Sequence, residues 1–350
     1  SKTLMTIFWY DNDKNVYRTH IDALKSGKQC YIYYNDTLYG SVDWKTEPSF
    51  SLKELYKLRA QEIRDSYERV ILCLSGGIDS RNVLESFYYN NIHIDEIISV
   101  GAFSQDEFFG SDENNNREIY VNVKQFLNEL TLPNTKFTII DYTEMFSDPK
   151  RFDTIKNLEE YWYTDLGCWK SLHNLYWKDL KKYLIKDNKK TCYVMGTGKT
   201  RIDFTQNDPF VFFDETDLTD YGFNYSDENL HRENFYWGNT KVSIEIIKKQ
   251  AYTMLNAYKI MNNTSFFLKY MKIYDRIIYD IKTPLYMPTK KSNTFLLSIR
   301  DEFIKRKMNS EIFKYYAEGL KKMSCDIGLK HKTHISRKYY LSHDENTNLF

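Results

Sequence analysis

The chain has 350 residues, enough for one large domain or two modest ones. Its 49 basic and 48 acidic residues leave a formal charge of +1, which gives no general attraction to nucleic acid or to a membrane surface. No apolar run reaches membrane length, the first residues lack the pattern of a signal peptide, and the five cysteines form no C-x-x-C pair. We therefore expect a cytoplasmic protein with free thiols and no membrane partner.

The N-terminal segment, residues 1–50, contains short alternating stretches. The clearest is residues 30–40, which predicts two strands around a turn at Asn35 and Asp36, a small β-hairpin. Two strands alone are marginally stable, so this segment is expected to pack on the rest of the chain.

A helix, a strand and a second helix are predicted next. Ser51 and Glu54 form a capping box that begins an amphipathic helix, which we expect to end near Tyr67. Residues 70–74 are an uninterrupted apolar run, typical of a buried strand in a parallel sheet. From Ser80 onward apolar residues recur at spacings of three and four, which indicates a helix.

The predicted strand and helix are joined by residues 75–80, Ser-Gly-Gly-Ile-Asp-Ser, which we call the first glycine loop. A loop of this kind directs backbone N–H groups and the positive end of a helix dipole at one point, which favours a phosphate. The hydroxyls of Ser75 and Ser80 add donors. Asp79 is an acid within an anion site, a combination that a Mg²⁺ ion bridging phosphate oxygens explains. The alternative is a tight turn with polar residues at a helix cap.

The first glycine loop resembles the pyrophosphate loop, Ser-Gly-Gly-x-Asp-Ser, of the N-type ATP pyrophosphatases, and no Walker sequence follows the strand. The resemblance covers about residues 51–215, where the order of elements is similar to that of the synthetase domain of asparagine synthetase, without a glutaminase domain. It implies ATP and Mg²⁺ as cofactors and cleavage of ATP to AMP and pyrophosphate. AMP would be transferred to a carboxylate, amide or ring carbonyl oxygen, and ammonia or an amine would then displace it.

Three further strands are predicted at residues 95–103, 136–141 and 191–195, with a helix over 119–130 between the first two. Residues 157–184, rich in Leu, Trp and Tyr, predict helix and core. In a doubly wound sheet, ligands lie beyond the carboxyl ends of the strands. The resemblance places adenine against the end of the first of these strands.

A second glycine loop, residues 196–201, follows the strand at 191–195. Its two glycines match those of Gly-Glu-Gly-Ser-Asp-Glu in asparagine synthetase-like proteins, but its basic residues replace the acids of that pattern. Lys199 and Arg201 are therefore candidates for direct phosphate contacts, and Asp203 for a shifted metal role. The alternative is a strand-end turn with solvated charges.

The rest of the chain carries weaker signals. Residues 208–214 are an apolar run between acids, and the acids that follow are candidates to receive an amine or form a solvated turn. Helices are predicted over 242–255 and 266–281. A proline-bounded loop at 282–291 offers Lys290 and Lys291 as phosphate contacts, by analogy with related enzymes. The basic, aromatic tail is either a nucleic-acid contact or a solvated terminus, and we favour the terminus.

The predicted fold is α/β, a doubly wound and mostly parallel sheet of the adenine nucleotide alpha hydrolase type with a helical C-terminal half. The domains are the hairpin segment 1–50, the ATP-binding domain 51–215, a helical substrate-side region 216–325 and the basic tail 326–350.

The predicted nucleotide-binding residues are Leu74, Ser75, Gly76, Gly77, Asp79, Ser80, Val100, Gly101, Phe103, Gly196, Thr197 and Gly198. Catalytic roles are predicted for Asp79, Lys199 and Arg201, with Asp79 also the metal ligand. The expected partners are a small-molecule acceptor and ammonia or an amine.

Two other functions stay open. The chain could modify a nucleobase of tRNA or DNA, which its neutral charge disfavours, or it could be an ATP-binding module without turnover, which the altered second loop would allow.

Overall fold

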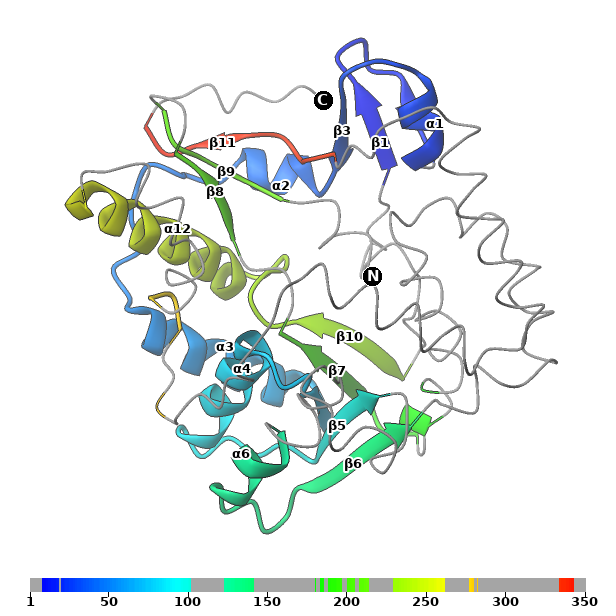
Figure 1. Cartoon of the computed structure of the whole chain (residues 1–350), viewed down its shortest axis with the longest axis vertical. Coiled ribbons are helices and arrows are strands. Elements are labelled where there is room, and N and C mark those ends of the chain that lie inside the picture. Colours follow the sequence, from blue (N-terminus) through cyan, green and yellow to red (C-terminus); the bar gives the residue numbers. More distant parts are fainter. Residues whose placement is uncertain are drawn as a thin grey trace, which may run out of the picture.

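The computed structural model describes residues 8–18, 20–101, 123–141, 180, 183–185, 188–196, 200–204, 208–213, 229–261, 277–279, 282 and 334–342. These residues form an α/β fold around a five-stranded parallel sheet, with two small antiparallel sheets at the opposite end of the molecule (Figure 1).

The parallel sheet consists of β4 (Arg69–Cys73), β5 (Glu96–Gly101), β6 (Lys136–Asp141), β7 (Thr191–Met195) and β10 (Leu230–Asn234). Its order is β10-β7-β4-β5-β6, so β4 is central and the direction of winding reverses between β4 and β7. The strands predicted at 136–141 and 191–195 are confirmed at both ends. β7 is almost wholly buried, as expected of a parallel strand covered on both faces, whereas β6 is an edge strand in which residues 137–140 are half-buried.

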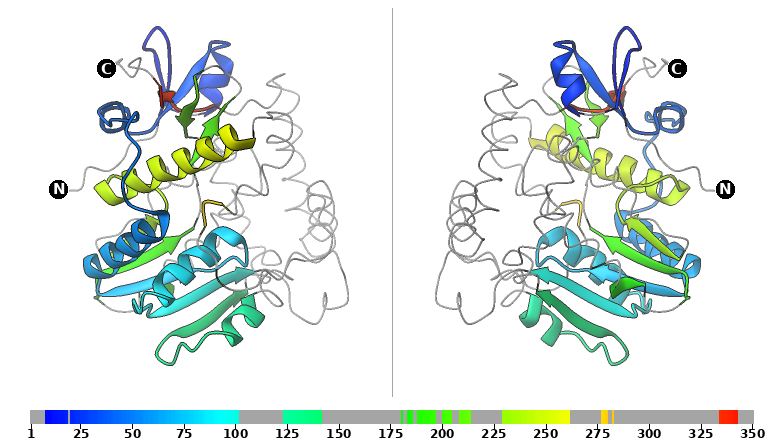
Figure 2. Two further views of the ribbon diagram at one scale, coloured as in Figure 1. Left: turned by 90° about the vertical axis from the view of Figure 1, so that its left-hand side faces the viewer. Right: turned by 90° about the vertical axis from the view of Figure 1, so that its right-hand side faces the viewer.

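Helices α3 (Leu52–Ser66), α4 (Ile78–Tyr88) and α12 (Lys241–Met261) pack together above the sheet (Figure 2). The capping box of α3 is confirmed. The Ser51 hydroxyl accepts from the Glu54 N–H at 3.2 Å, and the Glu54 carboxylate accepts from the Ser51 N–H at 2.8 Å. Helix α6 (Lys124–Asn128) precedes β6 and is shorter than the helix predicted at 119–130 within the part described.

The N-terminal sheet has the order β2-β1-β3, from β1 (Phe8–Asp11), β2 (Val16–Tyr17) and β3 (Cys30–Tyr33), with α1 (His20–Lys25) beside it. The hairpin predicted within residues 30–40 is wrong, because α2 (Asp36–Gly40) follows β3 directly. The buried Asp36 carboxylate accepts hydrogen bonds from the Tyr34 N–H at 3.1 Å and the Tyr10 hydroxyl at 2.7 Å. These contacts start a helix where a turn was expected, and β1 and β2 form the hairpin instead.

The third sheet joins β8 (Arg201–Asp203), β9 (Phe210–Phe212) and β11 (Tyr339–Tyr340) in the order β11-β9-β8. The interpretation of the tail as a solvated terminus is wrong for residues 334–342. Tyr339 is buried and stacks on Trp44, with 5.1 Å between ring centroids, and the Ile32 N–H donates to the Ile335 carbonyl at 3.1 Å. The aromatic residues of the tail bury it against the N-terminal segment despite its basic charge.

Residues 277–279 form a turn, so the helix predicted over 266–281 does not continue through them. Other predicted features lie outside the described residues: the acids at 214, 215 and 217, the lysines at 290 and 291, and most of 157–184.

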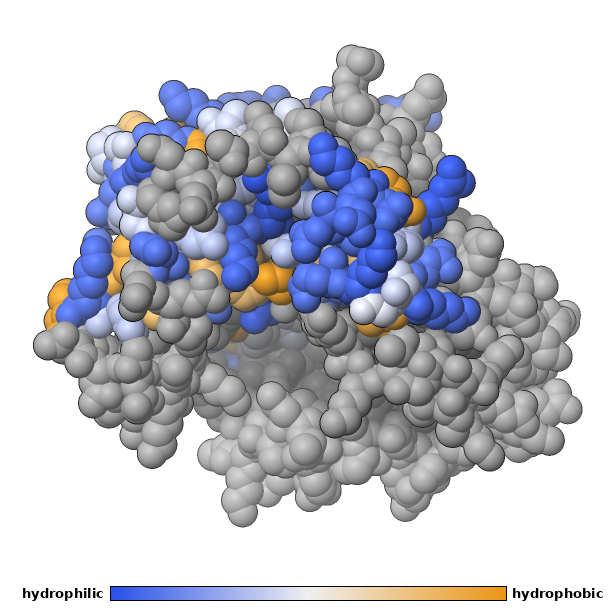
Figure 3. Space-filling view, turned by 90° about the horizontal axis from the view of Figure 1, so that it is seen from above, coloured by the Kyte–Doolittle hydropathy of each residue, from blue (hydrophilic) through white to orange (hydrophobic). Residues whose placement is uncertain are grey.

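From above, the described side chains are mostly hydrophilic, with apolar residues in small areas between them (Figure 3). Within the described ranges, no helix has the length and apolar character that a membrane crossing requires.

Candidate functional site

The first glycine loop lies at the carboxyl end of β4. Leu74 extends the strand by one residue, since its N–H donates to the Ile98 carbonyl at 2.8 Å and its carbonyl accepts from the Ser99 hydroxyl at 2.6 Å. Gly76 then takes a φ of 87°, a left-handed conformation that strains residues with a Cβ. Gly77 is the N-cap of α4 and supplies no side-chain cap. The N-cap residue of the helix therefore contributes no side-chain oxygen, and the Gly77 N–H donates to the Ser75 hydroxyl at 3.4 Å.

Hydrogen bonds of Ser75 and Ser80 join the two ends of the first glycine loop. The Ser80 hydroxyl, which is buried, accepts from the Ser75 N–H at 3.2 Å and donates to the Gly77 carbonyl at 3.2 Å. The two hydroxyl oxygens are 3.1 Å apart. Ser75 is exposed. The buried Ser80 thus fixes the shape of the loop, whereas Ser75 is open to solvent.

Gly196, the first residue of the second glycine loop, packs directly against the first loop. A Cβ at this position would lie 2.9 Å from the Cα of Ser80 and 3.0 Å from the carbonyl carbon and oxygen of Asp79. No side chain fits at that distance from a backbone, so glycine is required. The contact brings the carboxyl ends of β7 and β4 together where the winding of the sheet reverses.

The other predicted residues of the second loop are placed only in part. Thr197, Gly198 and Lys199 lie outside the described residues. Arg201 begins β8, where it is half-buried and pairs with Phe212.

Two of the residues predicted to hold adenine, Val100 and Gly101, lie at the end of β5, beside β4. The backbones of Val100 and Gly101 pair with Ile140 and Asp141 of β6. Phe103 lies outside the described residues. The order of the sheet places this strand end next to the first glycine loop.

Two tyrosines that the sequence did not identify hold Asp79, which is half-buried in the first turn of α4. The Tyr236 hydroxyl donates to the Asp79 carbonyl at 2.6 Å, and the Tyr279 hydroxyl donates to the Asp79 carboxylate. Burial, the neighbouring Tyr56 and the charge of Asp79 raise the pKa of Tyr236 well above its ordinary value. Burial, Tyr236 and Asp79 do the same to the pKa of Tyr279, so both hydroxyls remain proton donors.

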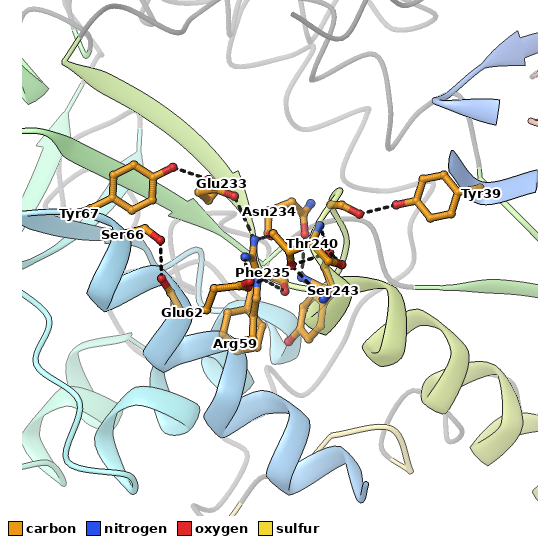
Figure 4. A network of polar contacts seen from close by, with 12 residues as sticks. Tyr39, Arg59, Glu62, Ser66, Tyr67, Glu233, Asn234, Phe235, Thr240 and Ser243 are labelled. Atoms are coloured by element: carbon orange, nitrogen blue, oxygen red, sulfur yellow. Dashed lines mark hydrogen bonds and ion pairs between the residues drawn. The ribbon is translucent and has the colours of Figure 1, made fainter. Parts of the chain in front are cut away.

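A buried arginine fixes the segment that carries Tyr236. Figure 4 shows Arg59 of α3 at the end of β10. Its guanidinium donates to the carbonyls of Asn234 at 2.8 Å and Phe235 at 3.3 Å, and pairs with Glu233 at 3.0 Å. Only 2% of Arg59 is exposed. Because these carbonyls immediately precede Tyr236, Arg59 sets the path along which the chain reaches Asp79.

Within the described residues, no group of three or more His, Cys, Asp or Glu side chains could hold a metal ion. A single carboxylate nevertheless suits Mg²⁺, which usually binds through one or two carboxylates together with phosphate oxygens and water. Asp79, at the positive end of α4, fits that donor set.

In comparisons with known proteins, no protein-family model and no curated protein sequence matches the chain.

Proposed function

We propose that this chain binds Mg²⁺-ATP at the first glycine loop and is an AMP-forming ligase that adenylates a carboxylate or amide oxygen. One observation carries the proposal. The Ser-Gly-Gly-x-Asp-Ser loop lies at the carboxyl end of the central parallel strand, against the point where the winding reverses, which is where open α/β sheets bind ligands.

The geometry of the loop suits a pyrophosphate group. The glycine cap leaves the N–H groups of the first turn of α4 without competition from a capping side chain, and the helix dipole adds positive potential there. The positive φ of Gly76 turns the backbone close to the cap, so that a phosphate can approach main-chain donors.

Asp79 would hold Mg²⁺ beside these donors. The ion, when bound, supplies positive charge to the phosphate oxygens. The role of the protein is to hold the carboxylate at the entrance of the loop and to aim the N–H groups at the departing pyrophosphate.

The reaction then needs positioning more than covalent chemistry. The acceptor oxygen attacks the α-phosphorus of ATP, the bond from that phosphorus to the bridging oxygen breaks, and pyrophosphate leaves with the electron pair. The loop donors stabilise the charge that develops on it. Ammonia or an amine next attacks the adenylated carbon and releases AMP. Lys199 and Arg201 are the candidates for contacts with the α-phosphate.

The proposal includes the finer architecture expected from the sequence. The sheet would be doubly wound in the adenine nucleotide alpha hydrolase manner, and the helical region 216–325 would line a pocket for a small-molecule acceptor. The protein would work in the cytoplasm.

Product analysis tests the proposal. The full chain is incubated with Mg²⁺-ATP and a panel of amino acids, ammonia and nucleosides, beside Asp79→Ala and the control Asp65→Ala, which changes an exposed acid of α3. AMP plus pyrophosphate, lost only in Asp79→Ala, is the expected result, and the stimulating acceptor names the substrate. ADP plus phosphate would overturn the mechanism. ATP binding without turnover on any acceptor would favour the non-catalytic module.

A further inference from the structure

We propose that Tyr279 is a positioning residue for the Asp79 carboxylate and that a buried chain of hydrogen bonds from the second glycine loop holds Tyr279 in place. The inference rests on the proposed binding of Mg²⁺-ATP at Asp79. It assigns a role to residues far from either glycine loop in the sequence.

Asp79 is held at two points. The Tyr279 hydroxyl donates to its carboxylate, while the Tyr236 hydroxyl donates to its carbonyl at 2.6 Å and accepts from the Asn82 amide at 3.0 Å. Tyr236 is fully buried and Tyr279 is 8% exposed. The short segment of residues 277–279 lies between α12 and α4 (Figure 2). Two rigid side chains therefore fix both the backbone and the carboxylate of one acid.

A chain of hydrogen bonds fixes the Tyr279 segment in turn. The Thr200 N–H donates to the Gln250 side-chain oxygen at 3.3 Å, and the Gln250 amide donates to the Tyr56 hydroxyl at 2.9 Å. The Tyr56 hydroxyl donates to the carbonyl of Ile278, the residue before Tyr279. Gln250 and Tyr56 are at most 1% exposed, so water does not compete for these bonds.

Gly196 and Thr200 of the second glycine loop are thus both linked to Asp79. Gly196 touches its backbone directly. Thr200 is linked to its carboxylate through hydrogen bonds of Gln250 and Tyr56 to the Ile278 carbonyl and then through the adjacent Tyr279. A carboxylate held before the ligand arrives loses less rotamer freedom on binding, which strengthens binding without adding a contact. A displacement of the second glycine loop would therefore also shift the Asp79 carboxylate, the proposed Mg²⁺ ligand.

The test compares ATP affinity with and without Mg²⁺ in the full-length protein, by calorimetry. Tyr279→Phe keeps the ring and removes the donor. We expect the increase in ATP affinity caused by Mg²⁺ to fall about tenfold, with affinity in the absence of Mg²⁺ unchanged. Gln250→Leu should cause a smaller loss of the same kind. Tyr252→Phe is the matched control, because its hydroxyl donates to the carbonyls of Trp44 and Lys45, away from Asp79.

A double-mutant cycle of Tyr279→Phe with Asp79→Ala, which removes the acceptor, is followed by urea unfolding and tests the contact without ATP. About a tenfold departure from additivity in the unfolding constant is expected. Additive effects would overturn the inference whatever the ATP data show. A coupled pair with an unchanged Mg²⁺ effect in Tyr279→Phe would also overturn it, and so would a gain in affinity, which would mean that the hydroxyl competes with the ion. Failure of the unmodified protein to bind ATP would overturn the proposed function and leave the coupling as purely structural.

Discussion

Replacing Gly196 by alanine should disturb the first glycine loop, because Gly196 packs against the backbone of that loop. The new Cβ would meet the Cα of Ser80 at 2.9 Å and the carbonyl of Asp79 at 3.0 Å, several tenths of an ångström inside ordinary contact. Both neighbours are backbone, so no side chain can rotate away and the end of β7 must move from α4. Overpacking of this kind costs about 1–3 kcal/mol. We expect that loss in urea unfolding, together with roughly tenfold weaker binding of Mg²⁺-ATP, since a tenfold change needs only about 1.4 kcal/mol.

Gly77→Ala is the matched control for stability. At φ −80° the added Cβ meets only the Ser75 hydroxyl oxygen, at 3.6 Å, which is ordinary contact. Its cost should stay near that of a poor N-cap residue, about 1 kcal/mol or less. The reasoning would be refuted if Gly196→Ala unfolded at the same urea concentration as the unmodified protein and bound ATP equally well.

Three further changes test the surroundings of the site. Tyr236→Phe removes two hydrogen bonds, to the Asp79 carbonyl and from the Asn82 amide, and should cost about 1–3 kcal/mol in urea unfolding; a neutral effect would show that these hydrogen bonds add no net stability. Arg59→Met removes the partner of a part-buried carboxylate and two carbonyls, and should cost about 3 kcal/mol by the same assay, whereas Lys53→Met on the exposed side of α3 should change little. Burial raises the pKa of Glu96, but hydrogen bonds from Tyr183, Thr138 and Arg69 outweigh it and hold the pKa below the ordinary 4.5. The stability that Glu96 adds is therefore present above that value and lost as the pH falls through the folded pKa, so Glu96→Gln should flatten the acid limb of a stability–pH curve, and an unchanged limb would contradict the assignment.

The central sheet could be predicted because its signals are local. An apolar run between polar residues located β4, β6 and β7, and a capping box located the start of α3. The first glycine loop was equally visible, since its pattern occupies six adjacent residues.

The partners of Asp79 could not be predicted, because nothing local marks them. Tyr236 and Tyr279 are separated from Asp79 by 157 and 200 residues, and in a chain with 30 tyrosines neither stands out. The error at Asp36 has the same origin. Asn-Asp is a sound turn signal, but the hydrogen bond from Tyr10 depends on the tertiary fold.

The pairing of β11 with β9 determines when the N-terminal segment can finish folding during synthesis. Domains generally fold as units during synthesis, the N-terminal part first. The N-terminal segment of this chain, however, donates from Ile32 to Ile335, and Tyr39 and Trp44 pack on Tyr339. Until residues 334–342 leave the ribosome, β9 keeps an open edge and these rings lack their cover, a state that invites pairing with other chains. The packing between the N-terminal segment, β9 and β11 can therefore be completed only after translation has reached β11.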